Sequence, residues 1–303
     1  MKVFAPDYYE KFKCIADRCQ HSCCIGWEID IDDETFEYYK GIDSDFGKRL
    51  RANIVKQDDC NCFKLTENER CPFLNDSNLC DIILNLSENA LCQICSDHPR
   101  FRNFYSDRIE VGLGLCCEEA ARLIITKQDK TNIEEIGDDE FVEELSDFEK
   151  TFFDKRNKYF EYFQNRELPI KERIALNNIN YSKKTLQKYL SLEILDNNWK
   201  ELITELSDCY DDIKDIQISG EFDICFEQLL VYFTYRHFTL LLDGIDEENI
   251  LRFIELSASV IYALCQFHIS KHKKLDILDI CEYARMYSSE IEYSSENLDT
   301  LTT

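Results

Sequence analysis

The stretch "EFDICFEQLLVYFTYRHFTLLLD", residues 221–243, is apolar on nearly every side when it is drawn as a helix. A helix that is apolar all round is normally buried in the core of a protein. The stretch therefore predicts a central helix around which a helical domain is built. The residues that follow the three- and four-residue spacing of an α-helix are Phe222, Phe226, Leu229, Leu230, Phe233 and His237.

Segments on both sides of this stretch carry further helical patterns. Residues 246–269 open with three acids, which a helix N-terminus favours, and continue as a wide apolar stripe. Upstream, aromatic residues recur at helical spacing from Phe141 to Phe163. We therefore expect a mainly α protein.

The first part of the chain has a different composition. Twelve of the 16 cysteines fall within the first 117 residues, and most stand beside Pro, Gly, Asn, Asp or another Cys. This contrast predicts a cysteine-rich, loop-rich, metal-binding domain over residues 1–126 and a helical domain over residues 133–303. The segment "KQDKTN", residues 127–132, is the expected linker.

Three uses compete for the thiols: disulfide bonds, metal ligation and apolar filling. The chain has no signal-peptide core at its start and no run of 18 apolar residues, so we expect a cytoplasmic protein that does not bind a membrane. Cytosolic thiols are mostly kept reduced, which disfavours disulfides. Four cysteines are isolated in apolar helical patterns and are expected to pack in the core as small hydrophobic side chains: Cys209, Cys225, Cys265 and Cys281.

The spacing of the remaining cysteines is typical of a metal site. A Cys-x3-Cys-Cys, a Cys-Pro-x-Leu and a Cys-x2-Cys occur within one hundred residues. Zinc and iron–sulfur sites both need several soft ligands that converge from separate loops, so the spacing predicts a metal without specifying which one. Adjacent side chains in an extended chain point to opposite sides. Only one of the two cysteines at positions 23 and 24 is therefore expected to reach a given metal centre. The predicted ligands are Cys14, Cys19, Cys23, Cys24, Cys71, Cys80, Cys92 and Cys95.

The charge of the chain limits its partners. Sixty acidic residues against 35 basic residues give a formal net charge of −25, which would repel a polyanion. We therefore expect no nucleic-acid partner. The acidic balance either favours a basic substrate, such as a lysine-bearing protein segment, or serves solubility alone.

Several landmarks, in order along nearly the whole chain, resemble the flagellin lysine-N-methylase family. Its cysteine-rich half is shared with a broader group of proteins described as iron- or zinc-chelating. The landmarks are "FKCIADRCQHSCCIGWEIDID" (12–32), "CPFLNDSNLCDI" (71–82), "ALCQICSDHPR" (90–100), "LGLCCEEAARLI" (113–124), "FEQLLVYFTYR" (226–236) and "YSSEIEYSSENLDTL" (287–301).

The resemblance implies transfer of methyl groups from S-adenosylmethionine to lysine ε-amines of flagellin. It also implies an iron–sulfur cluster, of the 4Fe–4S type, with zinc as the alternative metal. Cys117 matches the family's thiol in its segment and joins the predicted ligands, while Cys116 is additional. Gln228 and Tyr293 depart from the family's asparagine and histidine.

The site of methyl transfer is less visible in the sequence. The one Gly-rich stretch, "VGLGL" at residues 111–115, reads as a turn serving the cysteines, so no S-adenosylmethionine pocket is identified. A lysine must lose its proton before it can attack a methyl group, which calls for desolvation or a base. Glu227, Tyr235 and Arg236 are the predicted catalytic residues. The alternative function is a zinc- or iron–sulfur-binding interaction or redox module without methyltransferase activity.

Overall fold

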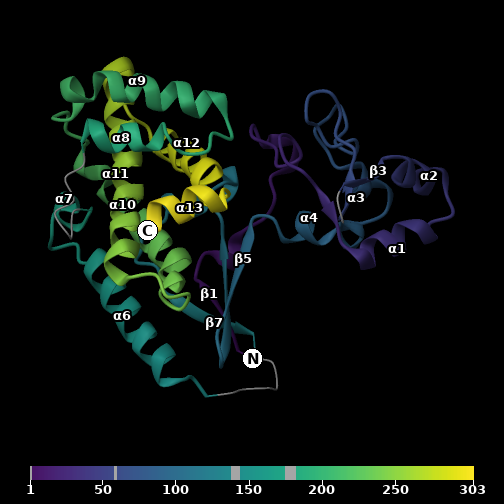
Figure 1. Ribbon diagram of the computed structural model, residues 1–303, viewed down its shortest axis with the longest axis horizontal. Helices are drawn as coiled ribbons and strands as arrows, with labels where there is room; N and C mark the ends of the chain where they lie inside the picture. The colour runs from purple at the N-terminus through teal and green to yellow at the C-terminus, as the bar shows by residue number, and fades with distance from the viewer. Residues whose placement is uncertain (1, 58–59, 138–143, 175–181) are drawn as a thin grey trace. The chain divides into compact units, whose positions relative to one another are not determined.

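The computed structural model describes residues 2–57, 60–137, 144–174 and 182–303 (Figure 1). The prediction of a mainly α protein is confirmed, with 56% helix and 12% strand. The chain forms two compact units. We call Lys13–Phe101 the cysteine unit, and Met1–Phe12 together with Arg102–Thr303 the helical unit.

These units are divided differently from the domains expected on either side of residues 127–132. Strand β1 (Lys2–Pro6) pairs in parallel with β6 (Arg108–Leu113) and antiparallel with β7 (Ile133–Gly137). Together with β5 (Arg100–Phe104) they form one sheet in the order β5-β6-β1-β7. Because these pairings join distant parts of the sequence, the start of the chain and the strands up to residue 137 become part of the helical unit.

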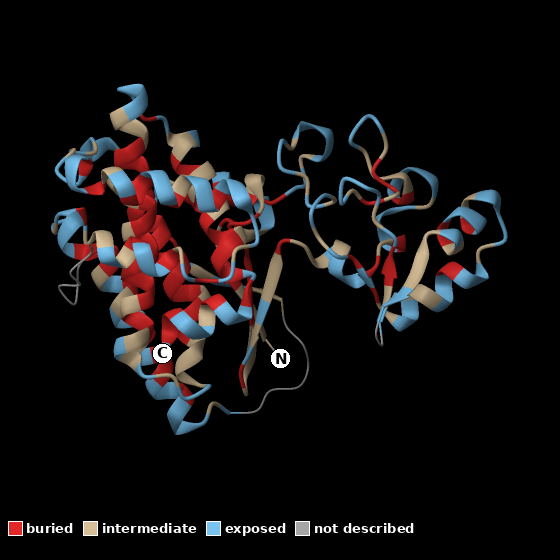
Figure 2. Ribbon diagram, turned by 45° about the horizontal axis from the view of Figure 1, so that its top comes forward, coloured by how far each residue is buried: buried red, intermediate tan, exposed pale blue. Residues whose placement is uncertain are grey.

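Helix α10 (Asp223–His237) lies at the centre of the helical unit, where buried residues run along nearly its whole length (Figure 2). This confirms the central helix predicted from residues 221–243. It packs against helices that come before and after it in the sequence. Those neighbours are α5 (Glu118–Ile125), α6 (Asp147–Phe163), α7 (Ile170–Ile174) and α11 (Glu247–His272).

Helix α11 is, among the described helices, the one long and apolar enough by composition to cross a membrane. However, 83% of its most apolar window is buried inside the protein. Its apolar surface is thus already covered, as in the core helix of a globular unit. The helices and turns that complete the helical unit are α8 (Lys183–Tyr189), α9 (Asn197–Ile213), α12 (Ile277–Tyr287), the π-helical turn η6 (Ser288–Glu292) and α13 (Ser295–Thr302).

The segment expected to be a linker is held against α10. The Nε2 group of Gln228 donates to the carbonyl oxygens of Lys127 and Asp129, at 3.2 and 2.8 Å. The Oγ1 hydroxyl of Thr131 donates to Oε1 of the same glutamine, at 2.7 Å. Residues 127–132 therefore form a bound loop of the helical unit. Gln228, one of the departures from the family pattern, holds this loop in place.

Helix α6 begins later than the aromatic pattern predicted. Ser146 caps it by accepting the Glu149 N–H at 3.2 Å, while the Glu149 carboxylate accepts the Ser146 N–H at 2.9 Å. This reciprocal capping box fixes the first helical residue. Phe148 is 57% exposed, so the aromatic stripe is not buried throughout, and Phe141 lies outside the described residues.

The cysteine unit has a small core of its own. An antiparallel sheet in the order β2-β4-β3 carries Phe63, whose ring lies 4.9 Å from that of Phe73. Tyr39, Leu50, Cys71 and Cys92 are buried in the same core. The elements of this unit are β2 (Asp30–Ile31), α1 (Asp33–Gly41), α2 (Asp45–Ala52), β3 (Ile54–Gln57), β4 (Cys60–Phe63), α3 (Asp81–Asn85) and α4 (Gln93–Asp97).

Candidate functional site

Five of the predicted metal ligands gather in the core of the cysteine unit. Cys71 and Cys92 are buried in that core, and Cys24, Cys80 and Cys95 are partly buried and packed against it. We call these five the thiol cluster. The backbone brings separate segments together here: the Cys71 N–H donates to the Cys24 carbonyl at 2.8 Å, and Cys80 bridges to Leu74.

The thiols of this cluster influence one another electrostatically. Burial, together with charge on Cys24, Cys80 and Cys92, raises the pKa of Cys71 to about 12. Burial also raises the pKa of Cys80. Several thiolates therefore cannot coexist here without a compensating positive charge. A metal cation would supply that charge, because it binds and stabilises the thiolate form.

Two pairs of cysteines are linked by thiol hydrogen bonds. A hydrogen bond from Cys23 lowers the pKa of Cys24 to about 7, against the effect of burial. Cys23 itself is exposed, whereas Cys24 packs against the core. At the start of α4, a hydrogen bond from Cys95 lowers the pKa of the N-cap residue Cys92, and the same bond together with burial raises the pKa of Cys95.

The other predicted ligands lie elsewhere. Cys14 is exposed, and its sulfur is 3.4 Å from the backbone nitrogen of Ala16. Cys19 is half-buried. Cys117 belongs to the helical unit, where it is the N-cap residue of α5. The structure thus gathers five of the nine predicted thiols, and a ligand role for any of the nine stays a prediction.

Two contacts that the sequence analysis missed hold the segment carrying Cys92 and Cys95. The Asp32 carboxylate caps α1 by accepting the Thr35 N–H at 2.9 Å, and it also accepts the Gln93 N–H at the start of α4, at 2.8 Å. The buried Tyr39 hydroxyl donates to the Ala90 carbonyl at 2.6 Å. The first contact could have been suspected, because aspartate is a preferred N-cap residue before a helix.

A second group of side chains, spaced closely enough to hold a metal ion, was not predicted. Glu28, Asp30 and Cys62 place three ligand atoms within 4.8 Å of one another, and the Cys62 thiol donates to Asp30 at 3.2 Å. Burial and the two carboxylates raise the pKa of Cys62 to about 12. Among the described residues, this is the one group of His, Cys, Asp or Glu side chains with three ligand atoms within 4.8 Å of one another. No three sulfurs of the thiol cluster, whose residues are all described, therefore lie that close together.

Glu227 and Tyr235, two of the predicted catalytic residues, make contacts inside the helical core. The fully buried Glu227 carboxylate accepts hydrogen bonds from Arg166 at 2.9 Å and from Arg173 at 2.8 Å. The Tyr235 hydroxyl donates to the Val111 carbonyl of β6 at 3.0 Å. These are the contacts of structural residues, and a catalytic role for either stays a prediction.

Arg236 belongs to a buried polar network that joins α10 to η6. Its Nη1 group donates to the Tyr232 hydroxyl at 2.8 Å, and its Nε lies 3.4 Å from the Glu292 carboxylate. That carboxylate accepts a hydrogen bond from Tyr232 at 3.0 Å and is also hydrogen-bonded to Nε2 of His237. Single π-helical turns such as η6 are frequent at functional sites. We call these four residues the Arg236 network.

The charges of this network are balanced. Burial raises the pKa of Glu292, but the Arg236 guanidinium and the His237 hydrogen bond outweigh it and hold the pKa below its usual range. Burial lowers the pKa of His237. The network therefore contains an ionised Glu292 paired with Arg236 and a neutral histidine.

Beside it, the hydroxyl of Tyr293 hydrogen-bonds to the thiol of Cys116, so two departures from the family pattern contact each other.

Comparison with known proteins agrees with the predicted resemblance. Over 144 residues the chain is 26% identical to a lysine-N-methylase of Salmonella typhimurium. The aligned segment covers 44% of this chain and 35% of the relative. The chain is similar to the lysine-N-methylases. Over 138 residues it is also 26% identical to the flagellar biosynthetic protein FliU of Salmonella muenchen, covering 42% of this chain and 79% of the relative. These matches confirm the resemblance.

A lysine-N-methylase of Salmonella choleraesuis gives the same identity, again with 35% of its length covered. The match therefore spans about a third of the length of each of these two lysine-N-methylases. No family model and no solved structure matches the chain.

Proposed function

We propose that this protein transfers methyl groups from S-adenosylmethionine to lysine ε-amines of flagellin, and that its thiol cluster holds an iron–sulfur cluster. The observation that carries the proposal is the similarity to lysine-N-methylases in a chain in which five of the nine predicted metal ligands gather in one core. The match to a flagellar biosynthetic protein supports flagellin as the substrate.

The donor atoms of the thiol cluster fit an iron–sulfur cluster better than a single zinc ion. Four sulfurs about 2.3 Å from one zinc ion lie roughly 3.8 Å from one another in a tetrahedron. In the described part of the chain, no three sulfurs of the thiol cluster lie within 4.8 Å of one another. An iron–sulfur cluster tolerates wider spacing because each thiolate binds its own iron. Cys24, Cys71, Cys80, Cys92 and Cys95 supply one more thiol than the four that such a cluster needs.

The chemistry requires a neutral lysine amine. S-adenosylmethionine supplies a methyl group on a sulfonium, and the amine lone pair forms the new N–C bond as the S–C bond breaks. This chain must therefore help the bound ammonium to lose a proton, which desolvation promotes. Arg236 is nearly buried, with 13% of its side chain exposed, and its positive charge is already paired with the Glu292 carboxylate.

Mass spectrometry of flagellin lysines tests the proposal in cells. Flagellin should carry methyl-lysine when the gene is present and none when it is deleted. A gene encoding Cys71→Ser should behave like the deletion, while one encoding Cys209→Ser, on α9, should restore methylation. Identical lysine modification with and without the gene would contradict the proposal.

A metal module without methyltransferase activity is the second candidate. It is favoured by one observation, which is that the match covers only 35% of each lysine-N-methylase. A purified protein that binds iron but transfers no methyl group to flagellin would support this candidate instead.

A further inference from the structure

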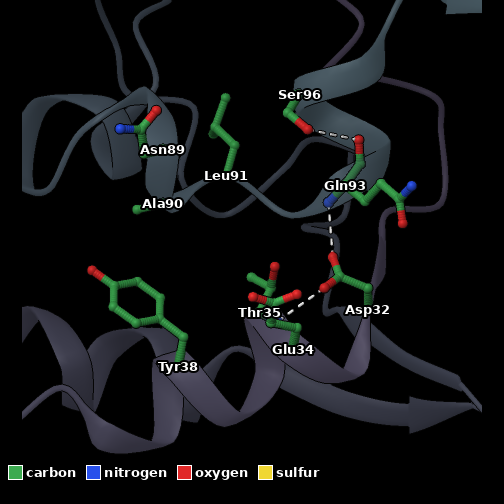
Figure 3. Close-up of a pocket in the computed structure, with 9 residues that line it drawn as sticks. All are labelled: Asp32, Glu34, Thr35, Tyr38, Asn89, Ala90, Leu91, Gln93 and Ser96. Atoms are coloured by element: carbon green, nitrogen blue, oxygen red, sulfur yellow. Dashed lines mark hydrogen bonds between the residues drawn. The ribbon is translucent and has the colours of Figure 1, made fainter. Parts of the chain in front are cut away.

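An open hollow in the cysteine unit lies between the start of α1 and the segment that leads into α4 (Figure 3). Its volume is about 510 Å³. Asp32, Glu34 and Tyr38 line one side, and Asn89, Leu91 and Gln93 line the other. The hollow lies within one compact unit, so it does not depend on how the two units are arranged.

The lining of the hollow is negatively charged. Its nine lining residues include two carboxylates and no lysine, arginine or histidine. Burial raises the pKa of Asp32, but hydrogen bonds from the backbone of Gln93 and Thr35 outweigh it, so this carboxylate stays ionised. The exposed Glu34 carboxylate has no hydrogen-bond or ion-pair partner among the described residues.

Apolar surface accompanies these charges. Tyr38 follows Glu34 by one helical turn on the same face of α1, and it is 50% exposed. Leu91 lines the opposite side of the hollow, but its side chain points away from α1 and packs against the core of the cysteine unit (Figure 3). A ligand with a cationic end and a flexible apolar chain would match both features, because an ammonium group binds carboxylates while its methylenes pack on the aromatic ring of Tyr38.

The helix dipole does not reverse this preference. The N-terminus of α1 carries about half a positive charge, which alone would repel a cation. Asp32, Asp33 and Glu34 place three carboxylates on that same turn. Their formal charge of about −3 exceeds the dipole charge several times, so the site as a whole attracts cations.

The hollow shares its wall with the thiol cluster. Leu91 and Gln93 flank Cys92 in the sequence, and the Gln93 N–H is fixed by Asp32. Tyr39, which donates to the Ala90 carbonyl, has a hydroxyl within electrostatic reach of Cys92, Cys95 and Cys80. A side chain bound in the hollow would therefore lie on the opposite side of one backbone segment from the thiols.

We propose that this hollow binds a lysine side chain of the protein substrate, with Glu34 and Asp32 receiving the ammonium group and Tyr38 covering the methylenes. This inference rests on the proposed function and names a place where the substrate docks. Because the two carboxylates stabilise the ammonium form, the hollow holds a charged lysine and is distinct from the place where the neutral amine is methylated.

The test measures binding of monomeric flagellin to the metal-loaded full-length protein by isothermal titration calorimetry at low salt. Glu34→Gln should weaken binding roughly two- to fivefold, the range of one partly exposed ion pair. Glu34→Lys should weaken it about tenfold or more, because it places like charges together. Glu37→Gln is the matched control, since it removes one negative charge from the same helix outside the hollow, and it should leave affinity within about twofold.

Flagellin whose lysines have been acetylated serves as a second probe, because acetylation removes the ammonium charge. The wild-type protein should bind it as weakly as Glu34→Lys binds the unmodified form. Equal affinity of wild type and Glu34→Lys, equal affinity for both probes, or no flagellin binding at all would overturn the inference. The expected binding pattern without any methyl transfer would overturn the proposed function and leave the binding site standing.

Discussion

Single residues of the same type serve different purposes in the two units. Cys71 lies among four other thiols in the cysteine unit, whereas Cys265 in α11 is fully buried in an apolar helical core. Cys225 and Cys281 are buried in that same helical core. The thiols around Cys71 can be ionised together only when a cation balances their charge. An isolated buried thiol behaves instead as a small hydrophobic side chain.

Replacing Cys71 by serine should remove most of the bound metal. A hydroxyl is a poor ligand for the soft metals that thiolates bind, so the visible absorption and iron content of anaerobically purified protein should fall by more than half. Cys209→Ser, outside the thiol cluster, should retain both. Unchanged iron in Cys71→Ser would show that Cys71 is not a ligand.

Glu227→Gln should destabilise the protein without a specific effect on catalysis. The substitution leaves the buried Arg173 guanidinium without its charge partner, which costs about 3–5 kcal/mol when a buried ion pair is broken. Glu135→Gln, at a surface pair with Lys2, should change the free energy of unfolding by less than about 1 kcal/mol.

The two variants of this comparison separate stability from chemistry. Chemical denaturation measures stability, and the methylation rate per folded molecule measures catalysis. A folded Glu227→Gln protein of normal stability that transfers no methyl groups would instead support the catalytic role predicted for Glu227.

Elements with long, local patterns could be predicted, and elements built from distant pairings could not. The apolar pattern of residues 221–243 was sufficient for α10, because helical hydrogen bonds join residues close in sequence. Strand β1 has only five residues and pairs with β6 more than one hundred residues away, so no local pattern revealed the sheet. The polar segment 127–132 was mistaken for a linker because its partner, Gln228, lies far along the chain.

The candidate site shows the same limits. Cysteine spacing was enough to predict that thiols from separate segments gather, because the ligands of metal sites occur in short repeated pairs; that they bind a metal stays a prediction. It could not distinguish the five gathered thiols from Cys14 or Cys117, since that distinction depends on which loops pack on the core of the cysteine unit. That Arg236, Tyr232, His237 and Glu292 contact one another could not be predicted, because Glu292 comes from η6 rather than from the helix that carries the other three.

The cap of α6 should make stability depend on pH. Burial raises the pKa of Glu149, but hydrogen bonds from Ser146 and Ser106 outweigh it and lower the pKa to about 2. A depressed folded-state pKa contributes stability that is present above the unfolded-state value of roughly 4.3 and is lost as pH falls toward 2. Between pH 5 and pH 3 the free energy of unfolding should therefore fall by about 1–3 kcal/mol through this group.

Glu149→Gln provides the test of that dependence. The amide cannot ionise, so the variant should be less stable at pH 6 and should lose less stability than wild type between pH 5 and pH 3. Asp147→Asn, at a fully exposed carboxylate on the same turn, serves as the control. Parallel pH profiles for wild type and Glu149→Gln would contradict the assignment of this cap.

At the scale of the whole molecule, the net charge of −25 should draw a lysine-bearing substrate to the protein. Raising salt from about 0.1 M to 1 M shortens the Debye length from roughly 10 Å to 3 Å, so methylation at subsaturating flagellin should slow. The rate should also rise with pH through the apparent pKa of the bound lysine, because the neutral amine is the nucleophile. Initial rates that respond to neither variable while chemistry limits the rate would refute this docking and deprotonation scheme.

Methyl transfer by the purified protein tests the central claim most directly. The protein, isolated anaerobically with its metal, is incubated with S-adenosylmethionine labelled on the methyl group and with monomeric flagellin, in parallel with Cys71→Ser and Cys209→Ser. We expect label on flagellin lysines with the wild type and Cys209→Ser, and little or none with Cys71→Ser. Wild-type protein that holds its metal and places no label on any flagellin lysine would contradict the account.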